Sequence, residues 1–134
     1  MFYDFAITVP KDTTELAPVT QVMKLTKGVV TRVEVQFPNG CAGLAHCKLL
    51  HEESQKWPTP PSTSFASDGH AIVIDENFEL NTEPFSLKAV CWNEDDTFSH
   101  TLYVRVGVLR CEIAIMILKV FQGLEKMLRL MGIK

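Results

Sequence analysis

The sequence predicts a mainly β protein: an antiparallel β-sandwich of about seven strands, of the jelly-roll or immunoglobulin-like kind, followed by a C-terminal α-helix. Two observations lead to this prediction. Short runs of alternating apolar and polar residues, separated by Gly, Pro and Asn, fill residues 1–109. The segment after them places apolar residues three and four positions apart, which is the period of a helix. With 134 residues, 46% of them hydrophobic, one core is expected, so residues 1–109 form the domain and residues 110–134 an appended helix.

The first half of the chain contains an extended segment, residues 1–9, and then three candidate strands, residues 19–26, 29–37 and 44–50. The second of these is the clearest, because its residues alternate strictly in character. The face predicted to be buried consists of Val29, Thr31, Val33, Val35 and Phe37. Turn-forming residues stand between the three segments, so we expect them to pair in succession as neighbouring antiparallel strands.

The second half begins with a long surface loop, residues 52–69, whose several prolines oppose regular ladder hydrogen bonding. A short strand follows at residues 71–75. Residues 85–92 and 101–108 then alternate apolar with other residues on either side of the sequence Asn-Glu-Asp-Asp-Thr. Such residues form turns readily, and we therefore predict that these two strands form a hairpin.

The C-terminal helix is predicted to carry a heptad seam. Its members follow one another at alternating spacings of four and three, and are Ile113, Ile117, Val120, Leu124, Met127 and Met131. Further apolar residues widen the stripe: Leu118, Phe121 and Leu128 beside it, and Ile115, Met116 and Leu130 beyond. In a two-stranded coil the flanking positions are usually charged, so this width favours three or more helices, or one helix between its own sheet and a neighbour.

The pattern alone leaves the partner of this helix open. It can form the core of a homo-oligomer, preferably a trimer or larger, or dock into a larger protein shell. It can also pack on its own sandwich, as helices of α+β domains do. A location on a membrane surface is a minor alternative, with basic residues facing lipid headgroups, namely Lys119, Lys126, Arg129 and Lys134.

Composition excludes several classes of function. The formal net charge of −3 provides no basic face for nucleic acid. The most apolar run is far shorter than the roughly 20 residues that a membrane-spanning helix needs. The four cysteines form no CxxC pair and no secretory signal is apparent, so we expect reduced thiols in a cytosolic product, although a bridge between Cys41 and Cys47 remains open.

No residue pattern predicts catalysis or a metal site. His46, Cys47 and His51 are near one another, but His46 and Cys47 would point to opposite faces of a strand. Ser67-Asp68-Gly69-His70 has the residue types of a hydrolase triad without a nucleophile elbow. The acidic residues Glu94, Asp95 and Asp96, with Asp75 and Glu76, match no calcium motif and are interpreted as turn residues. We therefore expect no enzyme, no metal and no cofactor.

One ligand site is kept as an alternative. Trp57 and Trp92 could form a stacking platform for a sugar, with Asn93 and Asp95 binding its hydroxyl groups, or the turn that holds these two polar residues could bind calcium. Tryptophans that close a core or an interface are commoner. The alternative function is thus a carbohydrate- or calcium-binding β-sandwich module.

A small sandwich with turn-rich loops, firm strands at residues 29–37 and 101–109, and a hydrophobic helical tail resembles the accessory capsid proteins of tailed bacteriophages, the cement or decoration class. The resemblance implies a protein without catalytic activity that binds at symmetric positions on an assembled shell, often as a trimer, and reinforces it. The leading prediction is therefore a structural protein of a virion, made in the host cytoplasm, or otherwise a cytoplasmic protein.

Overall fold

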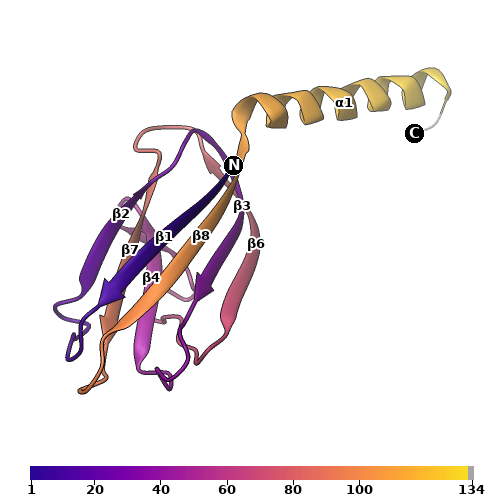
Figure 1. Ribbon diagram of the computed structural model, residues 1–134. Helices are drawn as coiled ribbons and strands as arrows, with labels where there is room; N and C mark the ends of the chain where they lie inside the picture. The colour runs from indigo at the N-terminus through magenta and orange to yellow at the C-terminus, as the bar shows by residue number, and fades with distance from the viewer. Residues whose placement is uncertain (133–134) are drawn as a thin grey trace.

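The computed structural model describes the backbone of residues 1–132, and the side chains of that span except those of residues 111 and 113–115. It contains two four-stranded antiparallel sheets that face each other, and a C-terminal helix that extends away from them (Figure 1). The strands are β1 (Phe2–Val9), β2 (Val19–Lys24), β3 (Gly28–Gln36), β4 (Ala45–His51), β5 (Ser54–Trp57), β6 (Ala71–Leu80), β7 (Ser86–Asn93) and β8 (His100–Arg110). The helix is α1 (Cys111–Leu130).

The strand order is that of a jelly roll. One sheet has the order β1-β8-β3-β6 and the other β2-β7-β4-β5. The first strand therefore pairs with the last, the second with the seventh, the third with the sixth and the fourth with the fifth. This nested order is that of one long hairpin rolled into two sheets. The pairing of β3 with β8 completes one sheet, and the pairing of β4 with β7 completes the other. The predicted antiparallel sandwich is confirmed, with eight strands where about seven were expected.

Three predicted pairings of strands are wrong. The segments at residues 19–26, 29–37 and 44–50 do not pair in succession, because β2 and β4 belong to one sheet and β3 to the other. The segments at residues 85–92 and 101–108 form no hairpin either, since β7 and β8 lie in different sheets. Local alternation specifies which residues face the core, but it does not specify whether the next strand pairs in the same sheet or crosses to the opposite one. The predicted long loop also differs, because β5 lies within residues 52–69.

The core lies between the sheets and is filled by alternate residues of every strand except the short β5, which contributes Trp57. In β3 the alternation changes phase at a β-bulge between Val30 and Arg32, where the extra residue shifts the ladder by one position. Val30 is therefore buried, whereas Val29 and Thr31, both predicted to face inward, are only partly buried. From Val33 onward the predicted face is confirmed.

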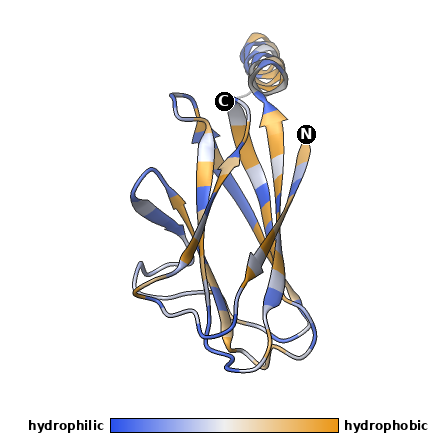
Figure 2. Cartoon of the chain, turned by 60° about the vertical axis from the view of Figure 1, so that its left-hand side comes forward, coloured by the Kyte–Doolittle hydropathy of each residue, from blue (hydrophilic) through white to orange (hydrophobic). Residues whose placement is uncertain are grey.

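The helix follows β8 without an intervening loop. Arg110 ends β8 and has an extended backbone, and the next residue is already helical. At the other end the amide N–H groups of Met131 and Gly132 donate to the carbonyl oxygens of Met127 and Arg129, and Gly132 has a φ of 75°, which glycine adopts without strain. Figure 2 shows the helix beyond the end of the sandwich, with apolar and polar residues both on its surface.

We predict that Gly28→Ala destabilises the sandwich. Gly28 begins β3, and a Cβ atom there would collide with the backbone carbonyl oxygen of Leu109 in β8. Because backbone cannot move aside as a side chain can, we expect a loss of about 1–3 kcal/mol of unfolding free energy, measured by urea denaturation. The matched control is Gly123→Ala in the helix, where a Cβ meets nothing within 4 Å.

The control should leave the unfolding midpoint of the sandwich unchanged and raise the helical signal in circular dichroism, because Ala favours a helix over Gly by roughly 0.5–1 kcal/mol. An unaltered midpoint for Gly28→Ala would contradict the close approach of β3 to β8.

Candidate functional site

The candidate functional site is the apolar face of α1. At about 100° per residue, eight apolar positions of the helix fall in an arc of roughly 140°. These positions, named here the apolar arc, are Ile113, Met116, Ile117, Val120, Phe121, Leu124, Met127 and Leu128. Met131, the last residue of the predicted seam, follows the helix as its C-cap. The arc thus contains the other five residues of the seam and three residues that flank it.

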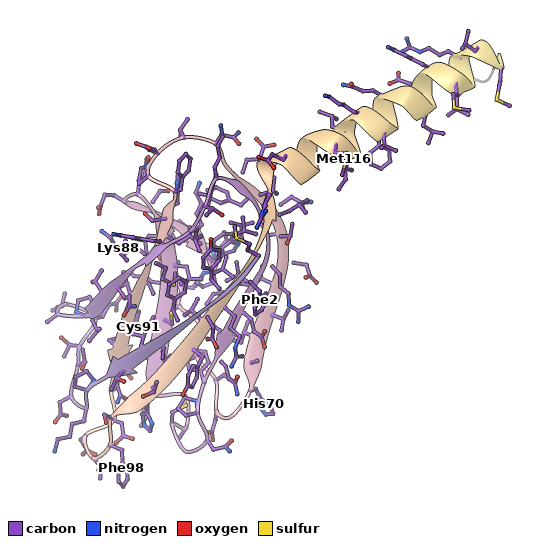
Figure 3. The ribbon with its side chains drawn as sticks, turned by 45° about the horizontal axis from the view of Figure 1, so that its top comes forward. Phe2, His70, Lys88, Cys91, Phe98 and Met116 are labelled. Atoms are coloured by element: carbon purple, nitrogen blue, oxygen red, sulfur yellow. The ribbon has the colours of Figure 1, made fainter. Side chains whose placement is uncertain are left out.

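Side chains of the apolar arc are exposed to solvent. Their exposed fractions run from 38% at Leu128 to 65% at Val120 among the described members. Figure 3 shows Met116 on the helix, clear of the side chains of the sandwich. The side chain of Ile113 lies outside the described residues. From Met116 to the end of the described chain every residue is exposed, so the sandwich does not cover the helix along this length.

The opposite side of the helix is mainly polar. It holds Lys119, Gln122, Glu125, Lys126 and Arg129. The guanidinium group of Arg129 donates to the Glu125 carboxylate at 2.6 Å, one turn apart, on a fully solvated surface. Such an exposed pair contributes little stability, about 0.3–0.5 kcal/mol. The helix is therefore amphipathic in the way of a helix that buries one side against a partner.

The surface at the base of the helix is hollowed. The N-terminal ammonium group of Met1 donates to the carbonyl oxygen of Val108 at 2.6 Å, which places the start of the chain beside the end of β8. A hollow of about 500 Å³ lies there between Met1, Thr26, Lys27, Arg110 and Glu112. A second hollow of similar volume lies at the adjoining ends of β2 and β7, where Leu25, Pro84 and Phe85 contribute apolar walls.

The two tryptophans considered as a sugar platform do not come together. Trp57 pairs with Leu49 in the β4–β5 ladder and so faces the core, where its ring packs edge-on against Phe78 at 5.7 Å. Trp92 pairs with His46 in the β4–β7 ladder and faces outward. Its ring is stacked on the His46 imidazole at 5.1 Å. Trp57 is 6% exposed and Trp92 4%, so neither presents a ring face to a ligand.

The polar residues of the same alternative shape the connection between β7 and β8. The Asn93 side chain donates to the carbonyl oxygen of Phe98 at 2.9 Å and accepts from the backbone N–H of Asp95 at 3.0 Å. The Asp95 carboxylate accepts from the backbone N–H of Thr97 at 2.8 Å and from His100 Nε2 at 2.9 Å. These hydrogen bonds lower the pKa of Asp95 below its ordinary value. The bond from Thr97 has the largest effect, and the bond from His100 the next largest. Sequence reasoning did not identify His100 as a partner.

Metal ligands do not gather within the described part of the chain, where no three His, Cys, Asp or Glu side chains could hold one ion. His46 and Cys47 were predicted to point to opposite faces of their strand, and this prediction is confirmed. Cys47 lies in the core, whereas His46 stacks on the outward-facing Trp92. Of the triad-like sequence, Asp68 accepts a hydrogen bond from the backbone N–H of Gly40 at 2.8 Å and so ties two loops together.

No profile of a protein family and no curated protein sequence matches the chain. Among the described residues, no helix is both long enough and apolar enough to cross a membrane.

We predict that the contribution of Asp95 to stability depends on pH. Because its pKa is lowered in the folded state, the ionised form is the one that folding favours. Its contribution should be full above the unfolded pKa of about 3.9, and should fall away as the pH drops through the lower folded value. We therefore expect Asp95→Asn to be less stable than the natural chain at pH 7 and the difference to shrink below about pH 4.

The measurement is urea unfolding at several pH values, followed by tryptophan fluorescence, since both tryptophans are buried. The matched control is Asp96→Asn at the neighbouring position, whose carboxylate accepts only the exposed hydroxyl of Thr97 among the described contacts. If the difference in unfolding free energy between Asp95→Asn and the natural chain stays constant down to about pH 2.5, ionisation of Asp95 does not contribute to stability.

Proposed function

We propose that this protein is a non-enzymatic structural protein whose helix joins it to further copies of itself, and that such an oligomer forms part of a larger protein assembly. The observation that carries the proposal is the exposed apolar arc of α1, joined without a loop to a sandwich whose core is already closed.

An exposed helix of this kind gains stability from association. In proteins most of the stability of a helix comes from packing of its apolar face against other elements, and not from the intrinsic helix propensity of its residues. Burying one Leu, Ile or Met side chain is worth about 1.5–3 kcal/mol. Four or five such side chains on each helix are therefore sufficient to offset the entropy lost when copies associate.

The residue types in the seam favour more than two helices. In heptad notation Ile117 and Leu124 occupy a positions, and Ile113 and Val120 occupy d positions. β-branched residues at d disfavour a parallel dimer and favour trimers or tetramers. The flanking e and g positions, which carry charges in dimers, hold Phe121, Leu128, Met116, Gly123 and Leu130. These residues can be covered only where each helix meets neighbours on both sides.

A place in a virion is the setting that the proposal favours. The eight-stranded jelly roll is used repeatedly for viral capsid proteins, although lectins and cupins share it, so this step rests on analogy of fold. An oligomer of sandwiches around a stalk of about 30 Å has the form of a component that decorates or reinforces a shell. The carbohydrate- or calcium-binding alternative is not proposed, because both tryptophans are buried and both polar residues are engaged within the turn.

We predict that Ile117→Asp with Leu124→Asp yields a folded monomer. Both side chains lie in the apolar arc, and each aspartate would have to be desolvated in a helix bundle, which is strongly unfavourable. The mass in solution, measured by light scattering after size exclusion, should fall from that of a trimer or larger to that of one chain. The circular dichroism of the sheets should not change.

The matched control is Lys119→Gln with Gln122→Asp, which changes the net charge by the same amount on the polar side of the helix, where both residues are exposed. It should retain the oligomer. If both double variants keep the mass of the natural chain, or if the natural chain is itself a monomer at tens of micromolar, self-association through this face is wrong.

We also predict that a chain ending at Arg110 folds. Its core residues all lie in the strands or in the loop between β3 and β4, and described side chains of the helix from Met116 onward add nothing to that core. The truncated chain should unfold cooperatively on heating, as a monomer. An unfolded product would mean that the helix completes the sandwich instead of joining copies.

A further inference from the structure

A second feature, independent of the helix, lies inside the sandwich. Cys47 of β4 and Cys91 of β7 face each other directly in the antiparallel ladder of the two central strands. Both residues are fully buried in the core, and both are free thiols. They are separated by more than forty positions in the sequence, so only the fold brings them together.

The backbone hydrogen bonds define the geometry of this pair. The N–H and C=O groups of Cys47 both bond to Phe65, on the side of β4 that faces away from β7. The N–H and C=O groups of a strand residue point to the same neighbouring strand. Neither backbone group of Cys47 is therefore available to Cys91, and the two cysteines form a non-hydrogen-bonded pair. In such a pair the Cα atoms are about 4.5 Å apart, which lies within the range that disulfides span.

The two side chains also influence each other. The Cys91 thiol opposite it, and then burial, raise the pKa of Cys47 well above its ordinary value. A thiol in this state is not ionised at neutral pH and is not reached by solvent, so it does not react while the sandwich is closed. The chemistry must therefore take place before the strands close or when they open.

We propose that Cys47 and Cys91 are a covalent modification site: they form an intramolecular disulfide when the chain folds in the presence of a small disulfide oxidant such as oxidised glutathione. One cysteine thiolate attacks a sulfur of the oxidant, forming a mixed disulfide and releasing one glutathione. The second cysteine thiolate then attacks the protein sulfur of the mixed disulfide and releases the other glutathione. The protein loses two electrons and two protons overall, and the oxidant is reduced to two thiols.

The other cysteines do not offer an equivalent pair. The Cys41 thiol donates to the carbonyl oxygen of Ser67 at 2.8 Å, and therefore points toward a loop. The sequence left a bridge between Cys41 and Cys47 open. In the structure, however, the residue directly opposite Cys47 in the ladder is Cys91. The side chain of Cys111 lies outside the described residues.

Closure of this bond would link the two central strands of one sheet. Because the bridge closes a long loop of the unfolded chain, its stabilising effect on the folded state should be large. It would also be protected, since a reductant can reach the buried sulfur atoms only when the sheet opens. The bond therefore distinguishes a chain that folds in a reducing compartment from one that folds, or refolds, outside it.

The experiment uses the full-length chain with Cys41→Ser and Cys111→Ala, so that only the proposed pair remains. The chain is unfolded in guanidinium, refolded in a mixture of reduced and oxidised glutathione, and treated with an alkylating agent. We expect an intact mass lower by two hydrogens with no alkylation, a Cys47–Cys91 crosslink in the peptide map, and a thermal midpoint about 10 °C or more above that of the same chain with reductant.

The comparison of oxidised with reduced forms of one chain needs no substitution in the pair, so it holds even if Cys91→Ala fails to fold. Cys91→Ala in the same background is the control, and its thermal midpoint should not respond to reductant. Two alkylated cysteines after oxidative refolding, glutathione adducts in place of the crosslink, or an oxidised form no more stable than the reduced form would each overturn the proposal.

Discussion

Strand β8 is the element on which the rest of the structure depends. It lies between β1 and β3 in its sheet, and its alternate residues Leu102, Val104, Val106 and Val108 are buried in the core. It is also continuous with the helix, so the course of the last strand determines where the helix begins. Connections that fold a helix back onto a sheet commonly need a few residues of loop. Here none is present, and the helix leaves the sandwich at its end (Figure 1).

Much of the fold could be predicted from the sequence because alternation is a local property. The strands at residues 29–37 and 101–108 were located, and so was the helix, because each period repeats within a few residues. Pairing could not be predicted in the same way. Residues such as Asn93 and Asp95 form turns whether the next strand pairs with the previous one or crosses to the opposite sheet. The bulge in β3 was equally invisible, since it depends on how β6 and β8 lie against that strand.

The candidate sites differ in predictability for the same reason. The apolar arc of the helix could be predicted because it depends only on a helical period along one segment. The sugar platform depended on the relative facing of Trp57 and Trp92, which the register of β4 with two different neighbours decides. The facing of Cys47 and Cys91 depends on that register too, and no spacing in the sequence indicates it. Features confined to one element could therefore be predicted from the sequence, whereas features shared between strands could be identified only from the fold.

The two parts of the molecule stand in different relations to their surroundings. The sandwich buries its core residues within one chain, between its two sheets. The helix has no such cover along its described side chains. In the proposed assembly, packing of its apolar face against other copies supplies the stability that the sandwich does not. Since anything that binds the helical form stabilises it by mass action, helix content and association are then expected to rise together with concentration. On this proposal the sandwich provides a durable shape, and the helix sets the number and arrangement of copies.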